Sequence, residues 1–427
     1  MEIALYSMKT KLLLSGLFLL GFNALAQDSL QLSLRQAERQ FVKNNYQLIL
    51  QQYETDQAQA DVITARLFDN PEFSHENLFY NHETKRFLET SMASGQFNTS
   101  VSQLIKLAGK RNKNIQLAKA GVKLSTYAYF DLLRSLRYEL RSTFYKAYYT
   151  QQTLTVYQDQ IQAMEQLLAS SEKQFLLGNT ATKDVIRIKS LLYDLKTEQS
   201  DLQNELEDTQ SQIKILINSP AAQPLKLIVS PREEESYHLT HLNYTNLLDS
   251  AKTNRADLQL AKANLNYAEK SLSLQKANAV PDVALSLSYD LKGNYPEKYT
   301  GIGISIPIPL FNRNQGEIKK AKLALAAGNT ALQQQELFLE NEVYNSYKTA
   351  LRTENTYQSI DQDFSGDFEQ LIAQVHINFR NRNISLIEFL DLYEAYKAHV
   401  LQLNKLKYER MNAKEELNYV TGSTLFK

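Results

Sequence analysis

The sequence predicts a mainly helical protein with a small β part, built as two tandem copies of one structural design. The 427 residues include only 13 glycines and 8 prolines, which favours long helices over a loop-rich fold. Two stretches of alternating apolar residues, PDVALSLSYD (281–290) and GIGISIPIPL (301–310), stand between long helical patterns. The same order of features also recurs once along the chain, at an offset of roughly 200 residues.

Internal similarity defines the two copies. NNYQL (44–48) resembles NRADL (254–258), and FLLGNTATKDV (175–185) resembles FRNRNISLIEF (379–389). Between the copies, 218–242 contains three prolines and is predicted to be a linker. We therefore divide the chain into a first repeat, 27–217, the linker, 218–242, and a second repeat, 243–427.

Each repeat is expected to contain a helix, two strands, a very long helix and a last helix. All prolines fall outside the predicted helices, whose interiors they would break. The long helices would each extend roughly 100 Å, and apolar residues at alternating three- and four-residue spacing in the last helices predict coiled-coil packing. The expected elements are helix 30–68, strands within 72–105, long helix 110–177 and helix 184–217, then helix 243–278, strands within 282–309, long helix 315–380 and helix 385–420.

The N-terminus has the pattern of a secretory signal peptide. Lys9 and Lys11 precede an apolar run that ends in Ala24-Leu25-Ala26, as a basic start, apolar core and small-residue cleavage site require. We expect residues 1–26 to be removed, with Met1 or Met8 as the start. A membrane anchor is the weaker alternative, because the apolar run is short for a bilayer span.

Composition argues against several classes of function. The 47 basic and 47 acidic residues balance, whereas a nucleic-acid partner would require a basic surplus. The absence of cysteine excludes disulfides, thiolate ligands and a lipid attached to cysteine. No phosphate-binding loop or nucleophile motif is present, so we expect no enzyme activity, no catalytic residues and no cofactor. His238 and His241 are better explained as solvated linker residues than as a metal site.

The strands have the length and alternation of transmembrane β-strands. One face is expected to meet lipid and the other, of Gly, Ser and Ala, to line a lumen. Four strands cannot close a barrel, and lipid does not tolerate an open sheet edge, so two or three chains would have to share one barrel. An ordinary soluble hairpin is the alternative. The predicted lipid-facing residues are Val283, Leu285, Leu287, Ile302, Ile304 and Ile306.

Three motifs resemble those of the TolC-like outer-membrane efflux factors. Asn70-Pro71-Glu72 precedes the first strand, 102–107 (SQLIKL) runs into Gly109-Lys110-Arg111, and Phe175-x-x-Gly178-Asn179-Thr180 leads into Asp184-Val185. With the signal peptide and the tandem repeat, the resemblance covers nearly all of the mature chain. The first two of these motifs, from Asn70-Pro71-Glu72 to Gly109-Lys110-Arg111, are most similar to the heavy-metal cation branch, the CzcC- or CusC-like proteins.

The resemblance implies a homotrimer in the outer membrane, with a 12-stranded β-barrel continuous with a periplasmic coiled-coil tunnel. Its implied partners are a periplasmic adaptor (a membrane fusion protein), an inner-membrane pump of the resistance-nodulation-division type and outer-membrane lipid. The tunnel would be a passive exit, with metal cations as the expected cargo. Drug efflux and type I protein secretion remain alternatives, and a structural coiled-coil envelope protein is an alternative of another class.

The resemblance places both helix turns, 175–185 and 379–389, at the periplasmic entrance. Rings of charge in an oligomer can set selectivity and gating, whereas isolated exposed pairs contribute little, so solvated turn charges are the alternative. The expected entrance and adaptor-docking residues are Phe175, Gly178, Asn179, Thr180, Val185, Phe379, Arg382, Asn383, Ser385 and Phe389. The expected gating charges are Asp184, Arg187, Arg380, Arg382, Glu388 and Asp391, with pairs between chains such as Asp184 or Asp391 with Arg380 or Arg382.

Overall fold

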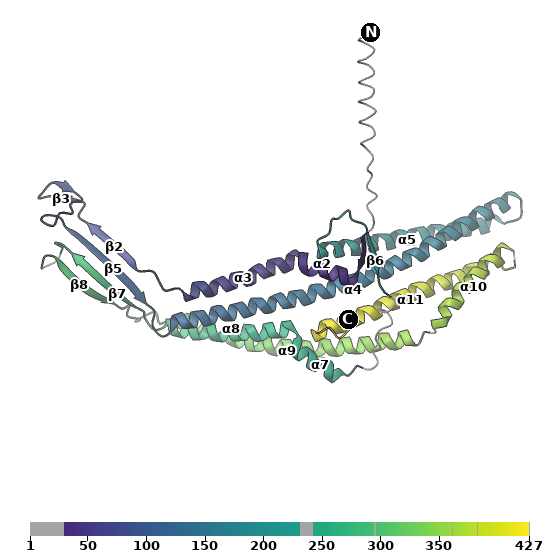
Figure 1. Cartoon of the computed structure of the whole chain (residues 1–427). Coiled ribbons are helices and arrows are strands. Elements are labelled where there is room, and N and C mark those ends of the chain that lie inside the picture. Colours follow the sequence, from purple (N-terminus) through teal and green to yellow (C-terminus); the bar gives the residue numbers. More distant parts are fainter. Residues whose placement is uncertain (1–29, 231–241, 294–295, 361, 382, 427) are drawn as a thin grey trace, which may run out of the picture. The chain divides into compact units, whose positions relative to one another are not determined.

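The computed structural model describes residues 30–230, 242–293, 296–360, 362–381 and 383–426 (Figure 1). These residues form long helices and a four-stranded sheet, so the mainly helical prediction is confirmed. The predicted signal peptide, the two linker histidines and Arg382 lie outside the described residues. No helix in the described residues combines the length and apolar character needed to cross a membrane.

The chain forms two compact units. Among the described residues, unit 1 takes its residues from within 30–45, 139–230 and 360–412, and unit 2 from within 46–138, 242–359 and 413–426. Helices α4 (Lys110–Leu176) and α11 (Leu386–Thr421) contribute residues to both. Unit 1 also contains β1 (Leu30–Ser33), α2 (Leu34–Asn44), α5 (Thr182–Ile217), β6 (Leu225–Ile228) and α10 (Gln362–Arg380). Unit 2 also contains α3 (Tyr46–Arg66), β2 (Glu72–Asn77), β3 (Tyr80–Asn81), β4 (Arg86–Phe87), β5 (Phe97–Ile105), α7 (Tyr244–Asn254), α8 (Ala256–Asn278), β7 (Val283–Asp290), β8 (Tyr299–Ser305) and α9 (Gln315–Gln358).

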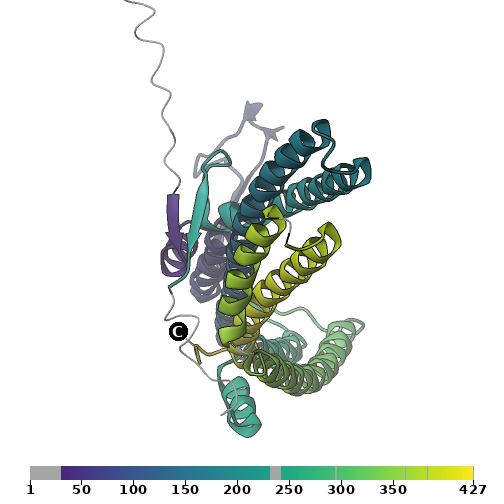
Figure 2. The same ribbon diagram turned by 90° about the vertical axis from the view of Figure 1, so that its right-hand side faces the viewer.

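Unit 1 is built on two helical hairpins, α4–α5 and α10–α11 (Figure 2). Their common core contains residues from all four helices: Tyr157, Ile161, Met164, Leu192, Leu195, Val375, Phe389 and Tyr393. Most of the predicted coiled-coil positions of α5 are buried, with Ile188 at 1% and Leu195 at 0% exposure. Beside this core, β6 pairs in parallel with β1, so the predicted linker contains a short strand.

Unit 2 contains the predicted strands as one antiparallel sheet in the order β2-β5-β7-β8. The strand expected to reach 309 instead ends at Ser305, since Pro307 and Pro309 have no N–H to donate to a sheet. Ile306, predicted as a lipid-facing strand residue, therefore lies just past β8. Strands β2 and β8 are the sheet edges, and neither pairs with another described strand on its outer side.

The predicted first helix of each repeat, 30–68 and 243–278, is broken in the structure. The breaks fall at Asn45 and Arg255, where ψ is 121° and 122°. Both side chains are buried, and each donates to a carbonyl near the end of the last helix of its repeat: Asn45 Nδ2 to Leu216 O at 3.0 Å and Arg255 Nη1 to Val420 O at 3.5 Å. The apolar pattern continues across both positions, which is why periodicity alone predicted uninterrupted helices.

The predicted long helix 315–380 is also two helices. α9 ends at Gln358 and α10 begins at Gln362. The hydroxyl of Ser359, the residue that follows α9, donates to Thr356 O at 2.7 Å. Such local bonds give the backbone an alternative to helix, and no proline or glycine in this stretch signalled the break.

A buried ionic network surrounds the second break, within unit 2. Arg255, 2% exposed, donates to Asp257 at 3.0 Å and lies 2.6 Å from Glu342. Asp257 is also 3.3 Å from Arg134, whose guanidinium lies 4.1 Å from the ring centroid of Tyr419. The network links α4, α8, α9 and the C-terminal end of α11, where cations oppose the negative end of the helix dipole.

Candidate functional site: two helix turns and a two-faced sheet

The first helix turn, between α4 and α5, is closed by a left-handed residue. Gly178 has φ +76°, which glycine adopts without steric cost. Its N–H donates to Phe175 O at 2.9 Å, and the Asn179 N–H donates to Gln174 O at 2.8 Å. The Asn179 side chain adds a bond to Gln174 Oε1 at 3.0 Å. Gly178 therefore supplies the left-handed position of this turn, and three hydrogen bonds hold it.

The second turn, between α10 and α11, repeats this pattern. The Asn383 N–H donates to Asn378 O at 2.8 Å, as the Asn179 N–H does to Gln174 O in the first turn. Ser385 and Glu388 then form a capping box at the start of α11, with bonds of 2.8 and 3.2 Å. Hydrogen bonds from the Ser385 backbone and side chain lower the pKa of Glu388, which gives this expected gating charge a local structural role.

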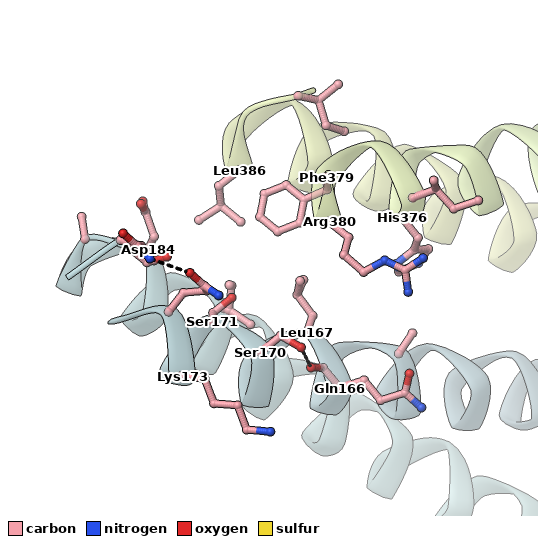
Figure 3. A pocket seen from close by; sticks show the side chains of 18 residues that line it. Gln166, Leu167, Ser170, Ser171, Lys173, Asp184, His376, Phe379, Arg380 and Leu386 are labelled. Atoms are coloured by element: carbon pink, nitrogen blue, oxygen red, sulfur yellow. Dashed lines mark hydrogen bonds between the residues drawn. The ribbon is translucent and has the colours of Figure 1, made fainter. Parts of the chain in front are cut away.

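A groove of about 780 Å³ lies between the two hairpins of unit 1 (Figure 3). Five of the residues expected at the entrance line it: Asn179, Thr180, Asp184, Phe379 and Arg380. Lys173, Gln166, Leu167, His376 and Leu386, which the sequence did not suggest, also line it. One wall is α4–α5 and the other is α10–α11, so residues of both hairpins line the groove.

Two expected docking residues are buried in the hairpin core. Val185 is 8% exposed and Phe389 is 0% exposed. The Phe389 ring packs against Phe379 at 4.8 Å and Tyr393 at 5.8 Å between centroids. Val185 and Phe389 therefore position the turns and do not offer a surface to a partner.

Exposed apolar residues gather at the two turns instead, most of them at the first. Leu176 and Leu177, at the end of α4, are 83% and 69% exposed, and the adjoining Phe175 is 41% exposed. Ile186 and Ile387, near the starts of α5 and α11, are 61% and 65% exposed. The sequence signal was the run of three apolar residues directly before Gly178, at a turn where polar residues are usual.

The charges expected to gate the entrance have different settings. Asp184 and Arg380 line the groove, whereas Arg187 and Asp391 are exposed outside it. Within the described part of the chain, no ion pair includes any of these four residues. The predicted pairs between chains therefore stay a prediction.

His376 is a groove residue that sequence reasoning missed. Its half-buried ring has an edge contact with Phe389 at 5.2 Å and lies 6.2 Å from the Tyr393 ring. Burial lowers the pKa of His376 and raises that of Tyr393. The Tyr393 hydroxyl is buried and has no hydrogen-bond partner among the described residues.

The sheet of unit 2 has one apolar face. Strand register aligns Phe73, Val101, Leu287 and Ile302 in a single row across all four strands. These side chains are 68%, 45%, 56% and 84% exposed, respectively. The predicted residues Val283, Leu285 and Ile304 lie on the same face, two or four residues away along their strands. The shared face is thus observed, and its contact with lipid remains a prediction.

The opposite face is polar and acidic. One row contains Glu72, Ser102, Ser286 and Gly303; another contains Glu76, Asn98, Asp290 and Tyr299. Every acidic residue of these four strands lies on this face, and the strands contain no Lys or Arg. Sequence reasoning missed Glu72 and Glu76, because their strand alternates poorly on its own and only the register reveals its phase.

Comparison with known proteins identifies the class of this fold. The sequence model of the outer membrane efflux protein family matches residues 247–423. The cobalt-zinc-cadmium resistance protein CzcC of Cupriavidus metallidurans is 20% identical over 363 residues, which cover 82% of this chain and 80% of CzcC.

Two solved channel structures have the same fold. A structure of CusC, described in connection with transmembrane channel formation, aligns with a TM-score of 0.72 and 17% identity over 91% of this chain and 92% of its own. The Campylobacter jejuni CmeC outer membrane channel aligns with a TM-score of 0.72 and 16% identity over 91% of this chain and 85% of its own. The resemblance to TolC-like outer-membrane efflux proteins and their heavy-metal branch is therefore confirmed. The matched family model is that of outer membrane efflux proteins, which agrees with the expected outer-membrane location.

Proposed function

We propose that this protein is the outer-membrane exit duct of a tripartite efflux system. Three copies, each supplying four strands, would complete a 12-stranded barrel, and their helices would form the periplasmic tunnel. The observation that carries the proposal is the four-stranded sheet. It has an exposed apolar face and two open edges, which lipid does not tolerate unless other strands close the barrel.

The groove between the helix turns is the proposed docking site for a periplasmic adaptor. A pump in the inner membrane, of the resistance-nodulation-division type, would deliver cargo through that adaptor. The groove offers both charges and apolar walls, Asp184 and Arg380 beside Phe379 and Leu386. Its fixed turns would let a helical partner bind without reordering the hairpins, which limits the entropy cost of association. The duct itself performs no chemistry.

Metal cations are the proposed cargo, and the polar face of the sheet supports this choice. In a barrel that points its apolar face to lipid, Glu72 and Glu76 of every copy face the lumen, among Ser and Gly and without a cationic strand residue. Rings of carboxylates favour cations in a channel. The similarity to CzcC, whose name refers to cobalt, zinc and cadmium resistance, agrees with this assignment.

Cargo is tested by growth of a deletion strain on graded Co, Zn, Cd, Ni, Cu and Ag salts, and on dyes, bile salts and antibiotics. The proposal predicts sensitivity to metals, restored by the intact gene. Sensitivity to drugs alone would contradict the metal assignment and favour the drug-efflux alternative.

The role of the acidic lumen face is tested by reversal potentials in planar bilayers under a KCl gradient. We expect the unsubstituted channel to prefer K⁺ over Cl⁻. In the double variant Glu72→Gln, Glu76→Gln this preference should fall toward the ratio of the two ions' mobilities in free solution. Glu83→Gln is the matched control, since Glu83 is exposed in the loop between β2 and β5. Equal selectivity in all three proteins would refute the role of the two glutamates.

A further inference from the structure

The connection between β2 and β5, residues 78–96, exposes large apolar side chains. Connections that face water are usually built from polar residues and glycine, and this one contains the short hairpin β3–β4. It includes an exposed run, 85–88 (KRFL), in which two cations precede two apolar residues. The most exposed apolar side chains of this β2–β5 loop are Phe79 at 69%, Phe87 at 64%, Leu88 at 57% and Met92 at 63%.

The β2–β5 loop is held together from inside by Glu89. Only 6% of this side chain is exposed, and its carboxylate accepts hydrogen bonds from three hydroxyl groups. The donors are the hydroxyls of Thr84, Ser91 and Ser94. From the hairpin between β7 and β8, Lys292 Nζ donates to Ala93 O at 2.6 Å. These bonds hold the interior of the loop, while its large apolar side chains stay outside.

Local packing also supports the exposed run. Lys85 and Leu88 have φ of +52° and +48°, in the left-handed region that residues with a side chain adopt only where neighbouring contacts hold them. The Leu88 N–H donates to Phe79 O at 3.0 Å. The Phe87 ring packs on the rings of Phe79 and Tyr80, with centroids 5.4 and 4.9 Å apart. The run is therefore part of the folded loop, although its side chains face solvent.

Strand register places the β2–β5 loop just beyond the end of the apolar face. The next row from Phe73 toward the loop has a polar atom in every side chain. It comprises His75, Thr99, Tyr289 and Thr300. From His75 to Leu78, where the loop starts, are three residues, or about 10 Å. A headgroup layer is about 5–8 Å thick on each side of the hydrocarbon core. A sheet whose apolar face spans that core therefore carries the loop at headgroup level, at the end away from the helices (Figure 1).

The charges of the exposed run match an anionic headgroup. The Arg86 guanidinium is 75% exposed and lies 3.8 Å from Glu89, whose carboxylate already accepts the three hydroxyl bonds. Lys85 is exposed as well, and among residues 78–96, all of which are described, Glu83 is the one exposed carboxylate. Two exposed cations thus outnumber one exposed anion. Guanidinium donors fit phosphate in a bidentate geometry, and cations beside apolar residues are typical of a membrane interface.

A phosphorylated lipid fits this surface better than a second copy of the chain. Contact between two identical runs would place Lys85 and Arg86 against the same cations of the other copy, and like charges oppose association. An anionic lipid offers both a partner for the cations and an apolar part for the neighbouring residues.

We propose that residues 85–88 bind the phosphate of an anionic lipid in the outer leaflet of the membrane. Lys85 and Arg86 contact the phosphate, and Phe87 and Leu88 lie against the apolar part of the lipid. The inference rests on the proposed function, because only a membrane-embedded sheet brings the loop to headgroup level. The periplasmic helices leave from the other end of the sheet, so this end faces the outer leaflet.

The test measures lipid binding by native mass spectrometry of the detergent-purified full chain. Diphosphoryl lipid A, a phosphorylated glucosamine lipid, is added at graded concentrations, and phosphatidylethanolamine, which has no net charge, is added in a parallel series. We expect lipid A to bind more tightly, and its apparent Kd to rise roughly 10- to 30-fold in Lys85→Gln, Arg86→Gln. The matched control Lys348→Gln, Arg352→Gln removes the same two charges from exposed positions of α9 and should leave this Kd unchanged.

Four results would overturn the inference. An equal Kd for lipid A in the loop variant and the control would show that the two cations do not bind it. An equal Kd for the two lipids would show that the phosphate charge is not recognised. Displacement of lipid A by inorganic phosphate at the same concentration would show that the site takes free phosphate and not a lipid. A disulfide between two copies of Leu88→Cys, in a chain otherwise without cysteine, would show that a second copy covers the run.

Channel conductance of the unsubstituted protein in planar bilayers separates this inference from the proposed function. A protein that conducts but gives any of the four results keeps its role as a duct and lacks the lipid site. A protein that neither conducts nor binds lipid A fails both proposals.

Discussion

Replacement of Phe389 by alanine should loosen the α10–α11 hairpin without unfolding the sheet. The ring is fully buried and contacts Phe379, Tyr393 and His376. Truncation of a buried phenylalanine costs about 3–5 kcal/mol, and three aromatic neighbours that would face a cavity place this site in that range. At about 1.4 kcal/mol per factor of ten, the hairpin should open roughly 100- to 4000-fold more often.

Hydrogen exchange measured by mass spectrometry on the purified protein checks this estimate. Peptides from α10 and the first half of α11 should lose protection by roughly two to three and a half decades in Phe389→Ala. Phe175→Ala is the matched control, because Phe175 is 41% exposed at the neighbouring turn and surface changes typically shift stability by less than about 0.5 kcal/mol. Equal exchange in the two variants would refute the assignment of Phe389 to the hairpin core.

Three further predictions concern single groups. Burial lowers the pKa of His376, so the folded state favours the neutral ring. The contribution of His376 to the stability of the fold is present above its unfolded pKa of about 6.5 and declines as the pH falls below that value. Exchange in α10 should therefore rise on acidification and become less pH-dependent in His376→Gln, whereas an unchanged pH profile would contradict this. Arg255→Met leaves Glu342 without its cation and Asp257 with Arg134 alone. The change should destabilise unit 2 by about 3 kcal/mol, seen as a lower melting temperature. An unchanged melting temperature would show that the network does not stabilise the unit. Asn45→Ala removes the buried hydrogen bond to Leu216 O and should cost about 1–3 kcal/mol. A larger loss of stability than in Arg255→Met would contradict the view that the ionic network at the second break stabilises the fold more than the neutral bond at the first.

Much of the fold was predictable, because local patterns specify it. The four strands alternate or lie at matching positions of the repeat, and Gly178 signals a turn because it tolerates positive φ. The breaks at Asn45 and Arg255 were not predictable. Their buried side chains bond to Leu216 and Val420, which are distant in sequence and leave no local signal.

The site was predictable in location more than in detail. Both turns were found from their similarity, and several predicted residues line the groove. Phe389 and Val185 were expected to meet a partner, but an apolar residue near a turn can face either outward or inward, and only packing decides which. Glu72 and Glu76 were missed because the face of a poorly alternating strand is set by its neighbour's register.

The most direct test of the central claim is single-channel recording of the protein purified from outer membranes and inserted into planar bilayers without any partner. The account predicts discrete conductance steps with a preference for cations, as expected of a barrel closed by several copies. A protein that inserts no channel, and is recovered as a soluble periplasmic monomer, would contradict the account and favour a structural role in the envelope.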